Sequence, residues 1–224
     1  MKALSVIKVT FKEMITKFHI KSKFIKTVKN RGVLLDAGCG NSSPYRTKRM
    51  RPDIYYVGVD VGDYNQAAPN LADEYAVSLP DEFHDTILNL GQRFDAVISS
   101  HNIEHCCDRE KTLDALIKVL KPGGKLYLSF PSEASVTFPS RKGTLNYYDD
   151  KTHTGVPPKF DDVIEKLKAQ TMEISFACKS YKPFFLCLIG FLLEPLSKIT
   201  KRCLIGRATW AYYGFESVII AVKR

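Results

Sequence analysis

The sequence contains no hydrophobic run long enough to cross a bilayer as a helix, which needs about 20 consecutive apolar residues. The apolar run at 184–193 is too short, and lysines interrupt the amino-terminal segment every few positions. Internal repeats and low-complexity tracts are also missing. These absences argue against a transmembrane or repeat protein, and a length of 224 residues suits one domain with elaborations.

Cysteine pairs of the Cys-x-x-Cys type are absent, although the chain has six cysteines: Cys39, Cys106, Cys107, Cys178, Cys187 and Cys203. Two of the six are adjacent, a spacing that does not suit a shared tetrahedral metal. No secretory leader precedes them, so the pattern predicts reduced thiols in a cytosolic protein. We therefore expect no metal site and a cytoplasmic location.

Positive charge is concentrated at the two ends of the chain. The net charge is +9, yet residues 1–31 carry +8, residues 32–178 carry −5 and residues 179–224 carry +6. A partner that requires positive charge is therefore expected to meet the ends. Three interpretations remain open: lysines in water on a packed helix, peripheral contact with an anionic membrane at its inner face, and, less favoured, binding of nucleic acid.

Residues 1–31 are predicted to form a basic amphipathic helix. Apolar side chains recur at steps of three, four or seven residues, which places them along one helical stripe. The stripe consists of Leu4, Ile7, Phe11, Met14, Phe18, Ile25 and Val28. Gly32 breaks the pattern, so we divide the chain into this helix and a second unit over residues 32–224.

Apolar and helical segments alternate after Gly32. Near-continuous apolar strands that alternate with helices are typical of a parallel sheet covered on both faces, which predicts an α/β fold of Rossmann-like type. Residues 131–158 are expected to form a long loop. We expect strands at 33–37, 54–60, 70–77, 94–100, 125–130, 172–179 and 216–223, and helices near 81–90, after an N-cap at Asp108, and at 159–170.

The first strand ends in a glycine turn, Val33-Leu34-Leu35-Asp36-Ala37-Gly38-Cys39-Gly40. Two glycines permit a tight turn and a close approach of a ligand to the backbone. The third glycine that a dinucleotide-binding turn uses is replaced by Ser43, which favours a ligand without a phosphate there and disfavours a nicotinamide dehydrogenase. Asp60 ends the second strand, where a carboxylate can accept hydrogen bonds from ribose hydroxyls.

Four segments in succession, LLDAGCG, VGVD, FDAVISSHNIEH and LKPGGKLYLSFP, resemble the motif series of class I S-adenosylmethionine-dependent methyltransferases (methyltransferase domain 11/12-like). The resemblance covers core residues 32–131 and leaves 132–224 as an acceptor-side loop and a C-terminal elaboration. It implies an enzyme with a seven-stranded, mainly parallel sheet whose last strand is antiparallel. It also implies S-adenosylmethionine bound over the carboxyl-terminal ends of the strands.

The resemblance assigns cofactor contacts by position. The contacts that it implies are Asp36, Gly38, Cys39 and Gly40 around the methionine moiety, Asp60 and Val61 at the ribose, and Ser99, Ser100 and His101 beneath the sulfonium. The acid that binds the adenine amino group in the family falls on Asp73 by local pattern. Spacing to Leu79-Pro80 points instead to Tyr75, so both positions remain open.

Two loops hold candidate catalytic residues. His105 follows the strand at 94–100 and either faces the acceptor or orders its own loop by hydrogen bonding. His153 lies in the loop after the fifth core strand, beside the strand ends where ligands bind in such sheets. An imidazole suits proton removal near pH 7, so His153, oriented by Asp149 or Asp150, is the preferred general base. A loop histidine with a purely structural role is an equally weighted alternative.

The leading functional prediction is O-methylation of a small molecule or glycan. A looser resemblance supports a saccharide acceptor, because Asp150-x-Thr-His153 and the terminal Gly214-Phe215-Glu216-Ser217 after Trp210 are similar to segments of methyltransferases associated with bacterial cell-surface polysaccharide synthesis. Methylation of RNA or protein is one alternative, and a non-catalytic cofactor-binding scaffold is another. The sequence does not identify the methyl acceptor.

Overall fold

The computed structural model describes residues 19–63, 71–205 and 207–224. Most of the predicted amino-terminal stripe lies outside these residues. Its last part is described as helix α2 (Ile20–Lys26), in which Ile25 is buried together with the neighbouring Val28. Among the described residues, no helix is both long and apolar enough to cross a membrane.

Seven strands form one sheet in the order β3-β2-β1-β4-β5-β7-β6. The first five strands are parallel to one another, and β7 runs antiparallel to both of its neighbours. The predicted seven-stranded α/β sheet with an antiparallel last strand is therefore confirmed. The strands are β1 (Val33–Ala37), β2 (Tyr55–Asp60), β3 (Glu74–Val77), β4 (Phe94–Ser100), β5 (Leu120–Pro131), β6 (Met172–Cys178) and β7 (Glu216–Lys223).

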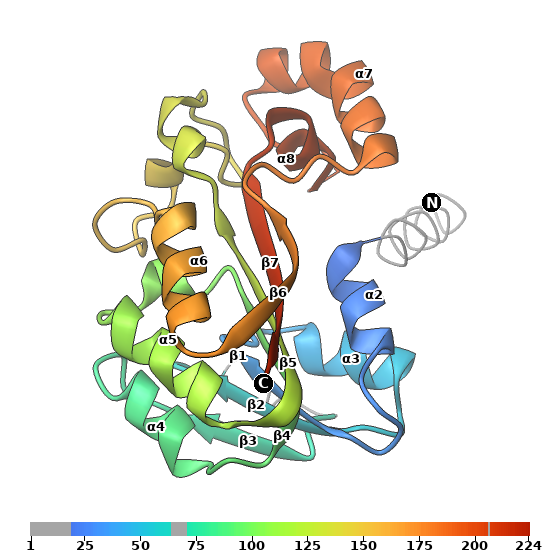
Figure 1. Cartoon of the computed structure of the whole chain (residues 1–224). Coiled ribbons are helices and arrows are strands. Elements are labelled where there is room, and N and C mark those ends of the chain that lie inside the picture. The colour runs from blue at the N-terminus through green and yellow to red at the C-terminus, as the bar shows by residue number, and fades with distance from the viewer. Residues whose placement is uncertain (1–18, 64–70, 206) are drawn as a thin grey trace.

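Helices cover both faces of the sheet, as Figure 1 shows. On one face, α4 (Phe83–Asn89), α5 (Arg109–Lys118) and α6 (Phe160–Ala169) bury apolar side chains against the strands. On the other face α2 packs Phe24, Ile25 and Val28 against the strands, and α3 (Ser43–Met50) lies beside it. Both faces are apolar, which explains why the parallel strands read as continuous hydrophobic runs in the sequence.

The order of the strands reverses between β1 and β4. In open α/β sheets the crevice outside the carboxyl ends of the strands at such a reversal is where ligands bind. Register places Ala37 of β1 beside Val59 of β2 and Ser99 of β4, so the loops that follow these three strands meet at one edge. We call this the carboxyl-terminal edge of the sheet.

The segment between β5 and α6 is the predicted long loop, with two short helical turns, η2 (Glu133–Thr137) and η3 (Tyr147–Asp149). Asp149 holds the loop together, because its carboxylate accepts hydrogen bonds from the backbone N–H groups of Arg141, Leu145 and Asn146. A third turn, η1 (Ile103–His105), follows β4. The loop and η1 lie at the carboxyl-terminal edge, next to the reversal.

The apolar run at 184–193 belongs to a longer helix, the 17-residue α7 (Phe184–Thr200). Glu194 does not terminate the helix because it is buried and paired with Arg141, with a shortest N–O distance of 2.6 Å. Pro195 lies on the exposed side, where water can satisfy the carbonyl group that loses its partner. Helix α7 packs on α8 (Arg207–Tyr213), next to the end of the sheet where β7 begins (Figure 1).

The contact between α7 and α8 depends on a residue without a side chain. A Cβ atom at Gly190 would lie 2.1 Å from the carbonyl oxygen of Ala208. We predict that Gly190→Ala separates the two helices and lowers the free energy of unfolding by about 1–3 kcal/mol, as overpacking does in other cores. Urea denaturation measures the free energy of unfolding, and Leu192→Ala on the exposed face of α7 is the control. Equal stability of both variants would contradict the described packing.

Candidate functional site

The glycine turn after β1 forms one wall of the site. Gly38 and Gly40 have φ of 72° and 58°, in the left-handed region that favours glycine. The N–H of Gly38 donates to the carbonyl oxygen of Val59, which ties the turn to β2. A Cβ at Gly38 would lie 2.3 Å from the side-chain oxygen of Asn102, whereas one at Gly40 would meet nothing within 4 Å. Gly38 is therefore needed for packing, and the open side of Gly40 is available to a ligand.

Asp60 is held firmly against this turn. One carboxylate oxygen accepts the N–H of Gly40 at 2.7 Å, and the other accepts the N–H of Val61 at 2.8 Å. Burial raises the pKa of Asp60, and these two hydrogen bonds oppose that rise. Each carboxylate oxygen keeps a further lone pair, so the geometry allows two more hydrogen bonds from a diol. Asp60 and Val61, the two residues predicted to contact the ribose, therefore lie together at the carboxyl-terminal end of β2.

Asp36 lies beneath the turn. Its side chain is fully buried, where it accepts hydrogen bonds from the hydroxyls of Tyr56 (2.9 Å) and Ser43 and has the ammonium of Lys21 at 3.6 Å. A buried carboxylate needs such partners, because an unpaired charge is expensive away from water. The predicted methionine-side residue thus joins β1, β2, α3 and the amino-terminal segment, and stabilises the turn from below.

A cleft of about 450 Å³ opens above the turn, which is within the roughly 300–1,000 Å³ of small-molecule sites. Of the predicted cofactor residues, Gly38, Cys39, Gly40, Ser100 and His101 line it. Ser99 is buried behind this wall, and its hydroxyl accepts a hydrogen bond from the side chain of Asn102. The wall also includes residues that the sequence did not indicate: His19, Lys21, Ser22, Arg207 and Trp210.

His101 is the most constrained side chain of the cleft. Its φ is 53°, which is unusual for a non-glycine residue. Nδ1 lies 3.2 Å from Glu104 and Nε2 lies 3.3 Å from Glu216, while the ring stacks on Phe215 and contacts Trp210. Burial alone would lower the pKa of His101, but hydrogen bonds to the two carboxylates raise it to about 9. His101 is therefore an imidazolium at pH 7 and cannot act as a base.

Glu216 connects His101 to two distant parts of the chain. Its carboxylate lies 3.3 Å from Nε2 of His19 and 3.8 Å from the guanidinium of Arg207. Burial would raise the pKa of Glu216, yet the bonds from His101 and His19 hold it well below its usual range. Burial, together with the charge of Arg207, lowers the pKa of His19. The predicted terminal segment thus supplies an anion that gathers three basic side chains around the cleft.

The two predicted catalytic histidines lie together, but neither is among the residues that line the cleft. The ring centroids of His105 and His153 are 4.7 Å apart. Nδ1 of His153 donates to the carbonyl oxygen of Tyr147 at 2.6 Å, and Nδ1 of His105 lies 2.9 Å from the hydroxyl of Thr152. Burial lowers the pKa of His153, so its imidazole is neutral at pH 7.

The predicted orienting role of Asp149 or Asp150 toward His153 is wrong in this structure. The carbonyl group of Tyr147 orients His153 instead, and the ring of Tyr147 stacks on it at 4.4 Å. Asp150 accepts the hydroxyl of Thr152 at 2.6 Å and so acts on His105 through that residue. The local sequence could not distinguish these arrangements because a backbone carbonyl leaves no signature in it.

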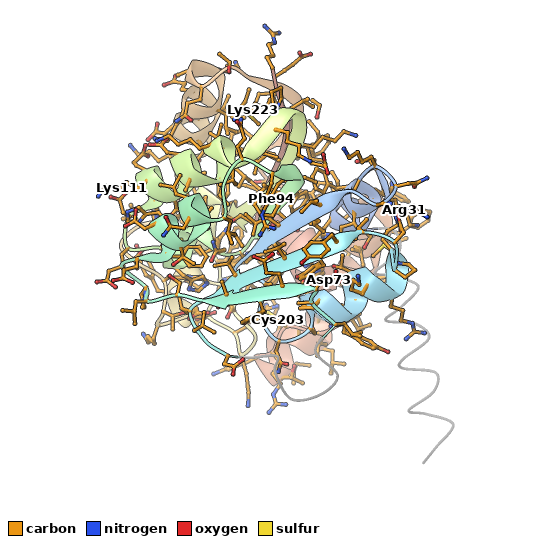
Figure 2. The ribbon with its side chains drawn as sticks, turned by 90° about the horizontal axis from the view of Figure 1, so that it is seen from below. Arg31, Asp73, Phe94, Lys111, Cys203 and Lys223 are labelled. Atoms are coloured by element: carbon orange, nitrogen blue, oxygen red, sulfur yellow. The ribbon has the colours of Figure 1, made fainter. Side chains whose placement is uncertain are left out.

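Asp73 does not reach the carboxyl-terminal edge. It directly precedes β3, where its carboxylate binds the ammonium of Lys48 at 2.7 Å and the N–H of Tyr56 at 2.7 Å. Figure 2 labels Asp73 on the same side of the picture as Arg31, which lies just before β1. The predicted adenine contact at Asp73 is therefore corrected to a structural role that joins β2 to α3. The hydroxyl of Tyr75 donates to the carbonyl oxygen of Gly62 at 2.7 Å.

All six cysteines are free thiols, as predicted. Burial raises the pKa of Cys106 to about 11, so it stays protonated at pH 7. A different set of potential metal ligands does converge in the described part of the chain, however. Glu104, His105 and His153 each offer a donor atom within 4.8 Å of the others. Reasoning from cysteine spacing could not find this set, because its members come from two loops.

Comparison with known proteins agrees with this geometry. Residues 35–128 match a family model described as a methyltransferase domain. This stretch is therefore similar to the methyltransferase domain of S-adenosylmethionine-dependent enzymes, and the strand order of the sheet agrees with that fold. S-adenosylmethionine is the methyl donor of that family, and the matched region contains the glycine turn, Asp60 and His101.

Two relatives and one solved structure illustrate the similarity. The chain is 28% identical over 108 residues to the tRNA (carboxymethyluridine(34)-5-O)-methyltransferase of Arabidopsis thaliana, which covers 45% of this chain and 24% of that protein. It is 26% identical over 135 residues to the mitochondrial ubiquinone biosynthesis O-methyltransferase of Homo sapiens, covering 53% and 36%. The chain thus spans well under half the length of either relative.

The structural similarity extends further than the sequence similarity. A SAM-dependent methyltransferase from Archaeoglobus fulgidus superposes with a TM-score of 0.57 at 18% identity, covering 95% of this chain and 94% of that one. At this identity the superposition establishes the shared fold of the methyltransferase domain and its C-terminal elaboration. It does not extend to the acceptor.

The charge of His101 can be tested directly. We predict that its imidazole titrates near pH 9 in the wild type and at lower pH in Glu216→Gln, because one of its two carboxylate partners is lost. Two-dimensional NMR of the ring protons measures both values. Because the pKa of His101 is raised in the folded protein, its ion pairs with Glu104 and Glu216 stabilise the fold fully below about pH 6.5. This contribution is lost as the pH rises through about 9. A wild-type titration near pH 6.5 would contradict the described network.

Proposed function

We propose that this protein transfers the methyl group of S-adenosylmethionine to a hydroxyl oxygen of a small molecule or glycan. The observation that carries the proposal is the cleft at the β1–β4 reversal, where the glycine turn and His101 face one another across a space of small-molecule size. Both curated relatives are named as O-methyltransferases. The looser resemblance of the 150–153 and 214–217 segments supports a saccharide acceptor.

The proposal places the cofactor in one orientation. Asp60 would accept the ribose hydroxyls, and the open backbone at Gly40 would lie against the methionine moiety. Val61, Val77 and Leu79 are exposed at the ends of β2 and β3, where the adenine ring would cover apolar surface. The sulfonium would then lie near Ser100 and His101. Catalysis in this arrangement is mainly positioning, since the sulfonium itself supplies the electrophile.

The acceptor would approach from the side of His105 and His153. Attack by a hydroxyl requires loss of its proton, and the cationic His101 has no free lone pair to take it. His153 and His105 have their Nδ1 atoms occupied by Tyr147 and Thr152, which leaves both Nε2 atoms for the acceptor side. We assign assistance of proton loss to this pair.

The affinity for the cofactor can test the different roles of Asp60 and Asp73. We predict that Asp60→Asn weakens binding of S-adenosylhomocysteine about tenfold or more, because charge-assisted hydrogen bonds to the ribose contribute about 1.5–3 kcal/mol. Asp73→Asn is the matched control on the opposite edge and should bind like the wild type. Isothermal titration calorimetry measures both. Equal affinity of Asp60→Asn and wild type would remove the proposed cofactor site.

The neutral state of His153 predicts the pH profile. Since burial lowers its pKa below 6.5, the rate should be constant near pH 7 and fall about tenfold per unit below the pKa of the buried ring, where the lone pair is lost to a proton. His84→Ala, a histidine of α4 outside the site, should keep this profile, and His153→Ala should lose the acidic limb. An inflection above pH 6.5 in the wild type would contradict the assignment.

We further propose that the protein meets its acceptor at an anionic membrane surface. Helix α7 exposes a row of large apolar side chains: Phe184, Phe185, Leu188, Phe191, Leu192, Leu196 and Ile199. Four exposed basic residues flank them, Lys182, Lys198, Lys201 and Arg202, and the one acid of the helix is buried against Arg141. An apolar face with a basic flank suits the boundary between anionic headgroups and acyl chains.

Flotation with vesicles tests this surface. Wild-type protein should float with vesicles of phosphatidylcholine and phosphatidylserine at low salt and remain below with phosphatidylcholine alone. Phe185→Ser combined with Leu192→Ser should abolish flotation, while Val156→Ser, an exposed apolar residue of another loop, should not. Association into dimers without flotation would show that a second copy covers α7, and would overturn the membrane proposal.

RNA methylation is the second candidate, because one relative is named as a tRNA methyltransferase and both ends of the chain are basic. Polyanion binding would release counterions, so its affinity would fall steeply with salt. Methyl transfer to tRNA in the presence of S-adenosylmethionine would favour this candidate over the glycan. Transfer of the methyl group to neither acceptor by a protein that binds the cofactor would favour the scaffold alternative.

A further inference from the structure

We propose that Glu104, His105 and His153 bind one divalent metal ion beside the methyl-transfer site. Two imidazoles and one carboxylate form a ligand set that zinc and other first-row cations accept, with positions left open for water or substrate. The three donor atoms lie within 4.8 Å of one another. That spacing is somewhat wider than donors at about 2.1 Å from one ion require, so the two rings would turn slightly inward on binding.

The tautomers of both histidines already suit a metal. The carbonyl oxygen of Tyr147 can only accept, so Nδ1 of His153 carries the proton and Nε2 keeps its lone pair. The hydroxyl of Thr152 donates to Asp150, and therefore its oxygen accepts from Nδ1 of His105. Metal-binding histidines generally donate their second N–H in this way, to a carbonyl group or to a residue tied to a carboxylate.

Glu104 supplies an independent observation. Its side chain is completely buried, and Oε1 accepts from His101 at 3.2 Å. Oε2 has no hydrogen-bond partner among the residues that the structure describes. A buried carboxylate oxygen without a partner is costly, and nearly all such atoms in folded proteins are satisfied. A cation held with His105 and His153 would provide the missing partner.

The position of this site gives the ion a chemical task, and this part of the inference rests on the proposed O-methylation. The ion would bind the acceptor hydroxyl and lower its pKa, so that the proton leaves to solvent at neutral pH. The oxygen then attacks the methyl carbon while the carbon–sulfur bond breaks and its electron pair passes to sulfur. The products are the methyl ether, the neutral thioether and one proton. In this step His105 and His153 assist proton loss as ligands of the ion, through their Nε2 atoms, and do not take up the proton themselves.

Binding of Mn²⁺ alone, followed by electron paramagnetic resonance, tests the site without cofactor or acceptor. Manganese is the suitable probe because the six free thiols prefer softer metals. We expect one Mn²⁺ per chain in the wild type, at least tenfold weaker binding in His105→Ala and His153→Ala, and unchanged binding in His84→Ala. Thermal unfolding with and without Mn²⁺ checks that each variant is folded.

Thr152→Val keeps the test decisive where a ligand variant fails to fold. It leaves all three ligands in place and removes the hydroxyl that links the N–H of His105 to Asp150, so binding should weaken about tenfold, as loss of such supporting partners does. Absence of bound Mn²⁺ in the folded wild type, or binding that none of these substitutions changes, would overturn the metal site. Either result would leave the proposed methyl transfer standing, since calorimetry with S-adenosylhomocysteine tests that separately.

Discussion

The buried carboxylate of Glu216 is the interaction on which the walls of the cleft depend. It is the first residue of β7, and it holds His101 at the end of β4, His19 before α2 and Arg207 at the start of α8. Taking an anion out of water is favourable only when its partners are well placed, and removal of one partner of a buried pair costs about 3–5 kcal/mol. The amino-terminal segment, the sheet and the C-terminal elaboration are therefore fixed relative to one another at the place where the ligand would lie.

The same network sets the electrostatics of the proposed reaction. A cationic imidazole next to a sulfonium would repel it, but Glu104 and Glu216 flank His101 and offset the charge of its imidazolium. Such carboxylates favour the cationic cofactor over its neutral product. Glu104 also joins this network to the histidine pair, because one of its oxygens contacts His101 and the other is free to face a cation. In the proposed reaction, Glu104 would therefore connect the residues beside the cofactor's positive charge to those that activate the acceptor.

Much of the fold could be predicted because its causes are local. The continuous apolar runs of β1, β2 and β4, the glycine turn and the N-cap at Asp108 follow from residue type and spacing, and the structure has each of them. Asp60 could be placed at the edge of the sheet for the same reason. Helix α7 was not predicted. It continues past Glu194 and Pro195 because Pro195 lies on its exposed side and Arg141 compensates Glu194, and neither fact is visible in the local sequence.

The acceptor side could be predicted only in part, because it depends on contacts between distant segments. His19, Arg207 and Trp210 come from the two ends of the chain and meet only through Glu216 and the stacking around His101. The predicted adenine contact at Asp73 was wrong because Asp73 precedes β3. An acid before a strand lies on the edge of the sheet opposite to an acid that follows it. Register, which the sequence did not establish for this short strand, decides between the two.

We propose that the cofactor, His101 and the Glu104–His105–His153 set share one reaction space. A crystal structure with S-adenosylhomocysteine and Mn²⁺, in which anomalous scattering locates both sulfur and manganese, tests it most directly. We expect the sulfur beside Ser100 and His101, and the manganese on the acceptor side within contact of all three ligands. A cofactor bound away from the β1–β4 reversal, or a manganese ion held elsewhere on the chain, would contradict it.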